Sequence, residues 1–173
     1  MSTVPVDSHG GADDEPTPNF RPLTAAGTAL GIGMGGFVDG IVLHQVLQLH
    51  NMLSARLPVT SLVNAKINMV WDGLFHGFTW IMTALGIFLL WRAGQRRDVP
   101  WSGRTLMGGM IQGWGWFNLV EGIIDHHALG LHHVVERAGL SVADYLFLFS
   151  GVVLILIGHA LIRAGRSDSL SRR

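Results

Sequence analysis

Two stretches of the chain carry an acid and histidines at the same spacing. VDGIVLHQVLQLH and, 82 residues later, VEGIIDHHALGLH agree at seven of thirteen positions, which pairs Asp39 with Glu121 and His44 with His126. Carboxylate oxygens and imidazole nitrogens together are ligands of iron, copper, zinc and manganese. The repetition of both ligand types therefore indicates a metal site, and helices that face one another could make it dinuclear.

Further acids and histidines lie at helical spacing. Asp72 precedes His76 by four residues and Glu121 precedes Asp125 by four, so each pair shares one face of a helix, about 6 Å apart along its axis. The sequence thus predicts seven metal ligands: Asp39, His44, Asp72, His76, Glu121, Asp125 and His126. We expect His132 and His133 to be peripheral and His50 to be an interface residue, and the role of His127 stays open.

Regular α-helices cannot aim all of these side chains at one ion. Residues five apart, such as Asp39 and His44, point about 140° apart on an ideal α-helix. Two solutions are open. Either the histidines reach a neighbouring interhelical space, or Gly40 and Gly122 permit a local irregularity of the π-bulge kind.

Four apolar segments must position these residues. Two of them, GLFHGFTWIMTALGIFLLW and YLFLFSGVVLILIGHALI, are long enough to cross a bilayer without a formal charge, and two run for 16 uncharged residues into Asp39 and Glu121. Because backbone polar groups in hydrocarbon must be satisfied within a segment, we expect an all-α integral membrane four-helix bundle. Its helices should cover roughly residues 23–50, 64–92, 104–128 and 142–163.

The internal similarity continues beyond the two stretches. DGLF, which begins at Asp72, resembles DYLF, which begins at Asp144. We interpret the chain as two repeated helix hairpins, related by a pseudo-twofold axis along the membrane normal. Glycines next to the acids, Gly40, Gly73, Gly77 and Gly122, would then let the helices approach closely around the site.

Basic residues are distributed unevenly between the two ends of the predicted bundle. Nine arginines fall at the end that holds both termini: Arg21, Arg92, Arg96, Arg97, Arg104, Arg163, Arg166, Arg172 and Arg173. Only Arg56, Lys66 and Arg137 fall at the other end. Positive charge concentrates on the cytoplasmic side, so we expect both termini in the cytoplasm and the histidine-bearing loops outside.

Composition limits the alternatives. Hydrophobic residues make up 49% of the chain and charged residues 14%, a balance that favours lipid as the solvent. A net charge of zero gives no electrostatic case for nucleic acid, and the absence of cysteine excludes thiolate ligands, iron–sulfur clusters and covalently attached haem. Residues 1–20 are predicted to be a disordered tail, residues 21–165 the membrane domain, and residues 166–173 a basic C-terminal tail.

Three blocks of the sequence carry a family resemblance. GFVDGIVLHQVLQLHNM, WDGLFH and GWGWFNLVEGIIDHHALGLHH resemble a family of small bacterial predicted membrane proteins catalogued as a domain of unknown function. The resemblance covers about residues 20–163 and implies a four-helix protein of the bacterial inner membrane, without implying an activity or a ligand set. Asn51 departs from the family pattern, in which a second histidine is expected after His50.

The first functional hypothesis is a metal-dependent membrane enzyme, redox or oxygen-activating rather than hydrolytic, with iron, copper or zinc ions at the site. An electron-transfer partner and a homo-oligomer are compatible with it. The alternatives are a copper-handling or assembly factor for a respiratory complex, and a haem b protein with His44 and His126 as axial ligands. A polar network that joins the helices without metal is the structural alternative.

Overall fold

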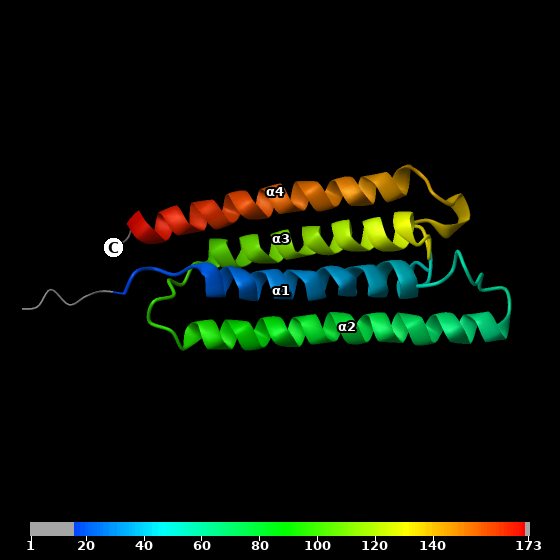
Figure 1. The fold of residues 1–173 in the computed structure, drawn as a ribbon, viewed down its shortest axis with the longest axis horizontal. Coiled ribbons are helices and arrows are strands. Elements are labelled where there is room, and N and C mark those ends of the chain that lie inside the picture. Colours follow the sequence, from blue (N-terminus) through cyan, green and yellow to red (C-terminus); the bar gives the residue numbers. More distant parts are fainter. Residues whose placement is uncertain (1–15, 172–173) are drawn as a thin grey trace, which may run out of the picture.

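The computed structural model describes residues 16–171, which form four long helices (Figure 1). The elements in chain order are α1 (Arg21–Val38) with its π-helical continuation η1 (Asp39–Val46), α2 (Leu62–Gly94), α3 (Gly103–Glu121) with its π-helical continuation η2 (Gly122–Ala128), the short 3₁₀ helix η3 (Glu136–Ala138) and α4 (Val142–Ser171). The all-α prediction is confirmed. The predicted N-terminal tail falls mainly on residues 1–15, outside the described residues, and the predicted C-terminal tail overlaps the last turns of α4.

The helices pack side by side in the order α2, α1, α3, α4 (Figure 1). α1 packs on both α2 and α3, and α3 packs on both α1 and α4. α2 and α3 make no extended contact with each other over the part of the chain that the structure describes. The two loops that follow η1 and η2 lie at the same end of the molecule (Figure 1).

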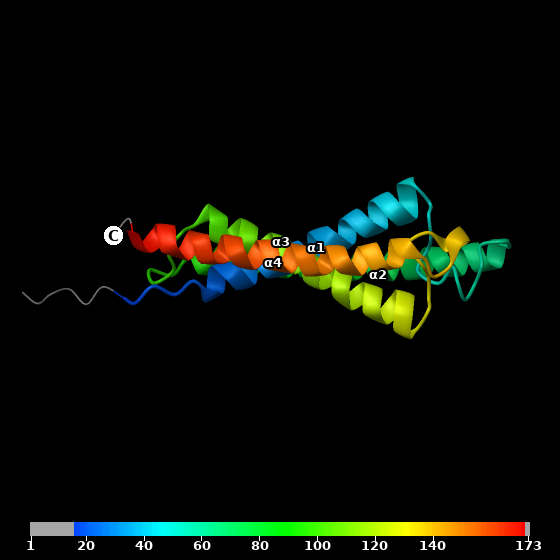
Figure 2. The ribbon, with the colours of Figure 1, turned by 90° about the horizontal axis from the view of Figure 1, so that it is seen from above.

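α1 and α3 approach so closely that only glycine fits between them. A Cβ on Gly27 would lie 2.5 Å from the Leu106 carbonyl oxygen, and Gly31, Gly109 and Gly113 likewise face backbone atoms of the opposite helix. Backbone contact of this kind is typical of helices that pack through small residues in membranes. Beyond the crossing the C-terminal ends of α1 and α3 diverge, which leaves room between them near the loops (Figure 2).

Two of the four glycines predicted to allow close helix approach do so. A Cβ on Gly40 would lie 2.8 Å from the His76 ring, and one on Gly122 would lie 2.8 Å from a side chain of α4. For Gly73 and Gly77 the prediction is wrong, because no described atom lies within 4 Å of either Cβ position and both residues are exposed on the outer face of α2.

The outside of the molecule is apolar and much of its interior is polar. Large side chains such as Trp80, Leu85, Leu146 and Phe149 are exposed on α2 and α4, an arrangement that suits lipid rather than water. By length and composition, three helices of the described chain could cross a membrane: Arg21–Val46, Leu62–Gly94 and Val142–Asp168.

Candidate metal centre

The π-helical segments bring together the acid and the histidine of each repeated stretch. Hydrogen bonds in a π-helix join residues five apart, so Asp39 and His44 lie one turn apart, as do Glu121 and His126. His44 Nε2 lies 3.1 Å from Asp39 Oδ2, and His126 Nε2 lies 3.3 Å from Glu121 Oε1. Of the two solutions that the sequence left open, the structure has the local π-helical irregularity.

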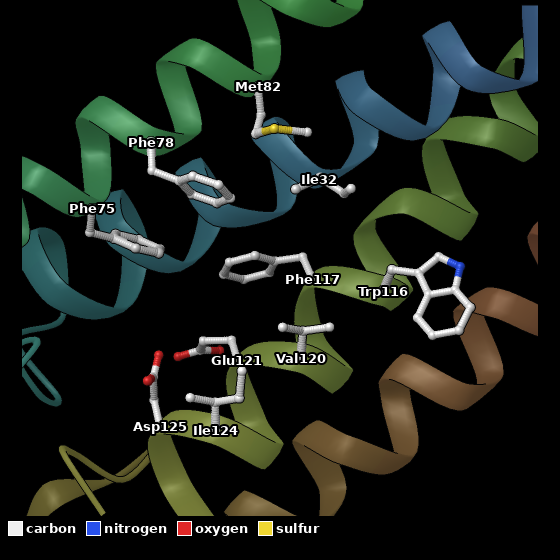
Figure 3. Close-up of a pocket in the computed structure, with 10 residues that line it drawn as sticks. All are labelled: Ile32, Phe75, Phe78, Met82, Trp116, Phe117, Val120, Glu121, Ile124 and Asp125. Carbon is white, nitrogen blue, oxygen red and sulfur yellow. The ribbon is translucent and has the colours of Figure 1, made fainter. Parts of the chain in front are cut away.

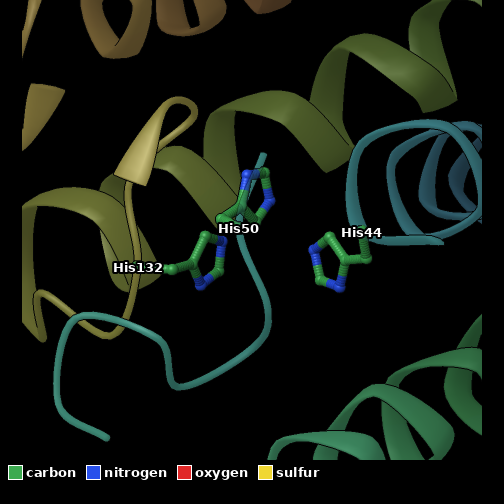
Figure 4. Close-up of side chains that lie close together, drawn as sticks. All are labelled: His44, His50 and His132. Carbon is green, nitrogen blue, oxygen red and sulfur yellow. The ribbon is translucent and has the colours of Figure 1, made fainter. Parts of the chain in front are cut away.

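The loops after η1 and η2 bring a second histidine close to each acid–histidine pair. Gln48 and Gly130 have φ angles of 50° and 53°, in the left-handed region, and there the chain turns back after each helix. His50 and His132 follow two residues later and lie buried between the diverging helix ends. Their rings stack with centroids 4.6 Å apart and planes 9° apart (Figure 4).

Six buried side chains therefore share one space. They are Asp39, His44, His50, Glu121, His126 and His132, none more than 6% exposed, and we call them the histidine cluster. The trios His44–His50–His132 and Glu121–His126–His132 each offer three ligand atoms within 4.8 Å of one another. Each trio has the number and type of atoms that could hold a transition-metal ion.

Hydrogen bonds outside the cluster fix which nitrogen of each ring faces inward. The Nδ1 atoms of three rings donate at 3.0–3.2 Å, His44 to Asp72, His50 to the Val134 carbonyl and His132 to the Met52 carbonyl. A carbonyl or an ionised carboxylate can only accept, so in the neutral ring Nε2 presents its lone pair to the cluster. His126 Nδ1 lies 3.2 Å from Asp144 Oδ1 but makes no hydrogen bond to any described residue, so the first three rings are the ones held in this way. Histidines that bind metals are held from behind in this way.

The inward-facing atoms have few hydrogen bonds of their own. Within the described chain, four of them have no hydrogen-bond partner: Asp39 Oδ2, His44 Nε2, His50 Nε2 and His126 Nε2. His44 Nε2 and Asp39 Oδ2 are close, yet their contact lacks hydrogen-bond geometry. Buried acceptors that face one another are costly unless a proton or a cation lies between them. A shared cation would remove this cost for several groups at once.

The pKa values of the two loop histidines are shifted in opposite directions. Burial and the neighbouring His132 and His44 lower the pKa of His50 to about 3, which leaves its ring neutral at physiological pH. Burial also lowers the pKa of His132, but the hydrogen bond of its Nε2 to Glu121, 3.0 Å long, together with the negative charges of Glu121 and Asp39, raises the pKa above its usual value. A proton on His132 and a cation in the cluster are thus alternative ways to neutralise Glu121.

Four of the seven predicted ligands lie in the cluster, namely Asp39, His44, Glu121 and His126. The other three lie around it. Asp72 sits behind His44, and His76 donates from Nδ1 to the Asp72 carbonyl oxygen at 2.7 Å. Asp125 lines an apolar cavity next to Glu121 (Figure 3).

The prediction from sequence missed His50 and His132 as members of the cluster. His132 was expected to be peripheral and His50 to be an interface residue, whereas the chain turns back before both residues and buries them in the cluster. A usable signal was present, because His50 and His132 occupy matching positions in the two stretches and Gly130 favours a turn. Asp144, which was not among the predicted ligands either, lies behind His126 as Asp72 lies behind His44, but without the hydrogen bond that Asp72 makes.

A family model matches residues 26–165, a segment that contains the whole histidine cluster. The family is described as predicted membrane protein (DUF2243). No curated protein and no solved structure matches the chain.

Proposed function

This chain belongs to the predicted membrane protein family whose model it matches, and on that premise we propose that it is an integral membrane metalloprotein with a transition-metal centre in the histidine cluster. One observation carries the proposal: imidazoles held from behind direct Nε2 atoms toward one another and toward two buried carboxylates. Such a mixture of nitrogen and oxygen donors suits iron, copper, zinc or manganese.

Two repeated helix hairpins would explain why the ligands come in two sets. The Met52 N–H donates to Asp72 and the Val134 N–H donates to Asp144, two matching contacts on the two acids behind the cluster. Each half contributes one carboxylate and two histidines. We therefore propose a dinuclear centre on a pseudo-twofold axis between α1 and α3, in which both halves supply ligands.

The proposed membrane placement has four spans, with both termini in the cytoplasm and the histidine loops at the outer face of the bacterial inner membrane. α3, continued by η2, would be the fourth span. It is less apolar than the others because it contains Gln112, Asn118 and Glu121 together with several glycines.

We propose that the centre catalyses a redox reaction, as an oxidoreductase rather than a hydrolase. The cluster is buried and borders an apolar cavity, a poor environment for a reaction that consumes water. Haem b fits less well than bare ions, because the His132 ring lies between the proposed axial ligands, with its centroid 5.8 Å from that of His44 and 4.8 Å from that of His126.

The test is elemental analysis and absorption spectroscopy of the full-length protein purified in mild detergent. We expect a redox-active transition metal, and we expect Asp39→Ala combined with Glu121→Ala to lose it. His50→Ala should also lose metal, whereas the controls His76→Ala and His127→Ala should keep it, since both of these rings donate to backbone carbonyls outside the cluster. Full metal occupancy in the double variant would overturn the assignment of the metal site to the histidine cluster. Zinc alone would favour hydrolysis, and reversible copper binding without turnover would favour copper handling.

A further inference from the structure

A cavity of about 400 Å³ lies beside the histidine cluster, between α2 and α3 (Figure 3). Its inner walls are apolar and mainly aromatic, formed by Ile32 of α1, Phe75 of α2 and Phe117 of α3. The volume lies within the range of sites that bind small organic molecules, roughly 300–1,000 Å³.

The cavity opens to the outer surface of the molecule. Phe78, Trp116, Val120 and Ile124 line it and are 44–52% exposed, so they form its rim. Because α2 and α3 make no extended contact in the described chain, nothing described separates this rim from the surroundings. In the proposed membrane placement the opening faces hydrocarbon, and it admits molecules dissolved in the bilayer.

The ionisable groups that line the cavity are two carboxyls at one end, Glu121 and Asp125 (Figure 3). Glu121 Oε2 is buried and has no hydrogen-bond partner among residues 16–171, while Oε1 accepts from His132 in the cluster. The Asp125 backbone carbonyl accepts from the Leu131 N–H, but the side-chain carboxyl makes no hydrogen bond or ion pair with any described residue. Carboxylates without partners at membrane depth are costly, and they mark places where a ligand or a proton binds.

Asp125 has no counterpart in the other half of the chain. The matching position, 82 residues earlier, is Leu43. The metal ligands proposed above are the same in type in both halves, so the additional acid is not needed to complete them. Asp125 lines the cavity, whereas Leu43 does not, which separates the role of Asp125 from that of the ligands.

We propose that this cavity binds the substrate of the metal centre, a neutral membrane-dissolved molecule with an apolar body and a head group whose hydroxyl groups donate hydrogen bonds to Glu121 and Asp125. The inference rests on the proposed function. Two carboxylates can accept hydrogen bonds from a hydroxyl but repel an anionic head group, which disfavours fatty acids and phospholipids. Glu121 belongs to both the histidine cluster and the cavity, so a head group bound to Glu121 lies next to the cluster.

The probe is a decyl-substituted hydroquinone, and its dimethyl ether, which cannot donate, is the matched control ligand. Binding to the full-length protein in lipid nanodiscs is measured by equilibrium dialysis. We expect the hydroquinone to bind at least about tenfold more tightly than the ether. Asp125→Leu, which installs the residue found at the matching position, should weaken hydroquinone binding by about tenfold and leave the ether unchanged.

A second pair of variants tests the cavity itself. Ile124→Trp should block both ligands by filling the rim, whereas Val42→Trp, the matching change in the other half, should block neither. Metal content is measured on each sample, which separates the two proposals. Hydroquinone binding by a protein without metal supports the cavity site and overturns the proposed function. A metal-loaded protein that does not bind the hydroquinone, or that binds it equally well with Asp125→Leu, overturns the cavity site.

Discussion

At the scale of single residues, the cluster depends on acids that do not enter it. Asp72 accepts from His44 Nδ1, from the Asn51 side chain and from the Met52 N–H, and so ties a ring of η1 to the loop behind it. An outer acceptor of this kind fixes the tautomer of a metal-binding histidine and makes its other nitrogen more basic. Asp72 therefore acts as a positioning residue for His44.

Asp72→Asn tests this role, because asparagine keeps one oxygen acceptor but removes the charge. We expect metal affinity, measured by competition with a chelator, to fall by about 10–100-fold while the protein still binds metal. Asp144→Asn, the matching change behind His126, should have a smaller effect, because His126 Nδ1 makes no hydrogen bond to Asp144. Complete loss of metal in Asp72→Asn, as large as that in Asp39→Ala, would instead make Asp72 a direct ligand, as the sequence alone predicts.

At the scale of elements, the helices were predictable and the loops were not. The lengths of the apolar runs predicted the four helices. The five-residue spacing of acid and histidine, beside Gly40 and Gly122, made a π-helical irregularity one of two ways to bring the two side chains together. The positions of His50 and His132 depend instead on one backbone conformation per loop, at Gln48 and Gly130. Helical periodicity assumes that the chain continues straight, so it cannot predict a segment that turns back.

The close crossing of α1 and α3 determines how far their ends diverge around the cluster. Gly31→Ala tests whether the protein depends on this close crossing. The added Cβ would clash with the Met110 backbone, which is not the end of a flexible side chain and cannot move aside alone. We expect a loss of about 1–3 kcal/mol in the free energy of unfolding, together with weaker metal binding.

The matched control for this crossing is Gly77→Ala on the outer face of α2, where no described atom lies near the Cβ. Removing glycine from a helix interior without a clash should stabilise the protein by about 0.5–1 kcal/mol. Both free energies can be measured by denaturant titration in detergent. Equal behaviour of the two variants would show that the crossing does not limit stability.

At the scale of the whole molecule, the interior is polar and the exterior is apolar, the reverse of a water-soluble protein. Buried positions hold acids, histidines and glycines, and the outward faces of α2 and α4 hold large apolar side chains. Most basic residues lie near the end that holds both termini, and few lie near the end that holds the histidine loops. An excess of basic residues on one side is the signal that orients a membrane protein. This division predicts that the cluster lies toward the outer leaflet, with its two loops at the outer surface.

The absence of cysteine allows this orientation to be tested one position at a time. Thr60→Cys places a thiol on an exposed residue of the first histidine loop, and Gln95→Cys places one at the opposite end, after α2, without removing a positive charge. In intact cells, a membrane-impermeant maleimide should label Thr60→Cys and spare Gln95→Cys until the membrane is opened. The reverse pattern would put the histidine loops in the cytoplasm, and metal ions would then reach the cluster from the cytoplasm. Labelling of both positions in intact cells would contradict the proposed membrane-spanning arrangement of α2.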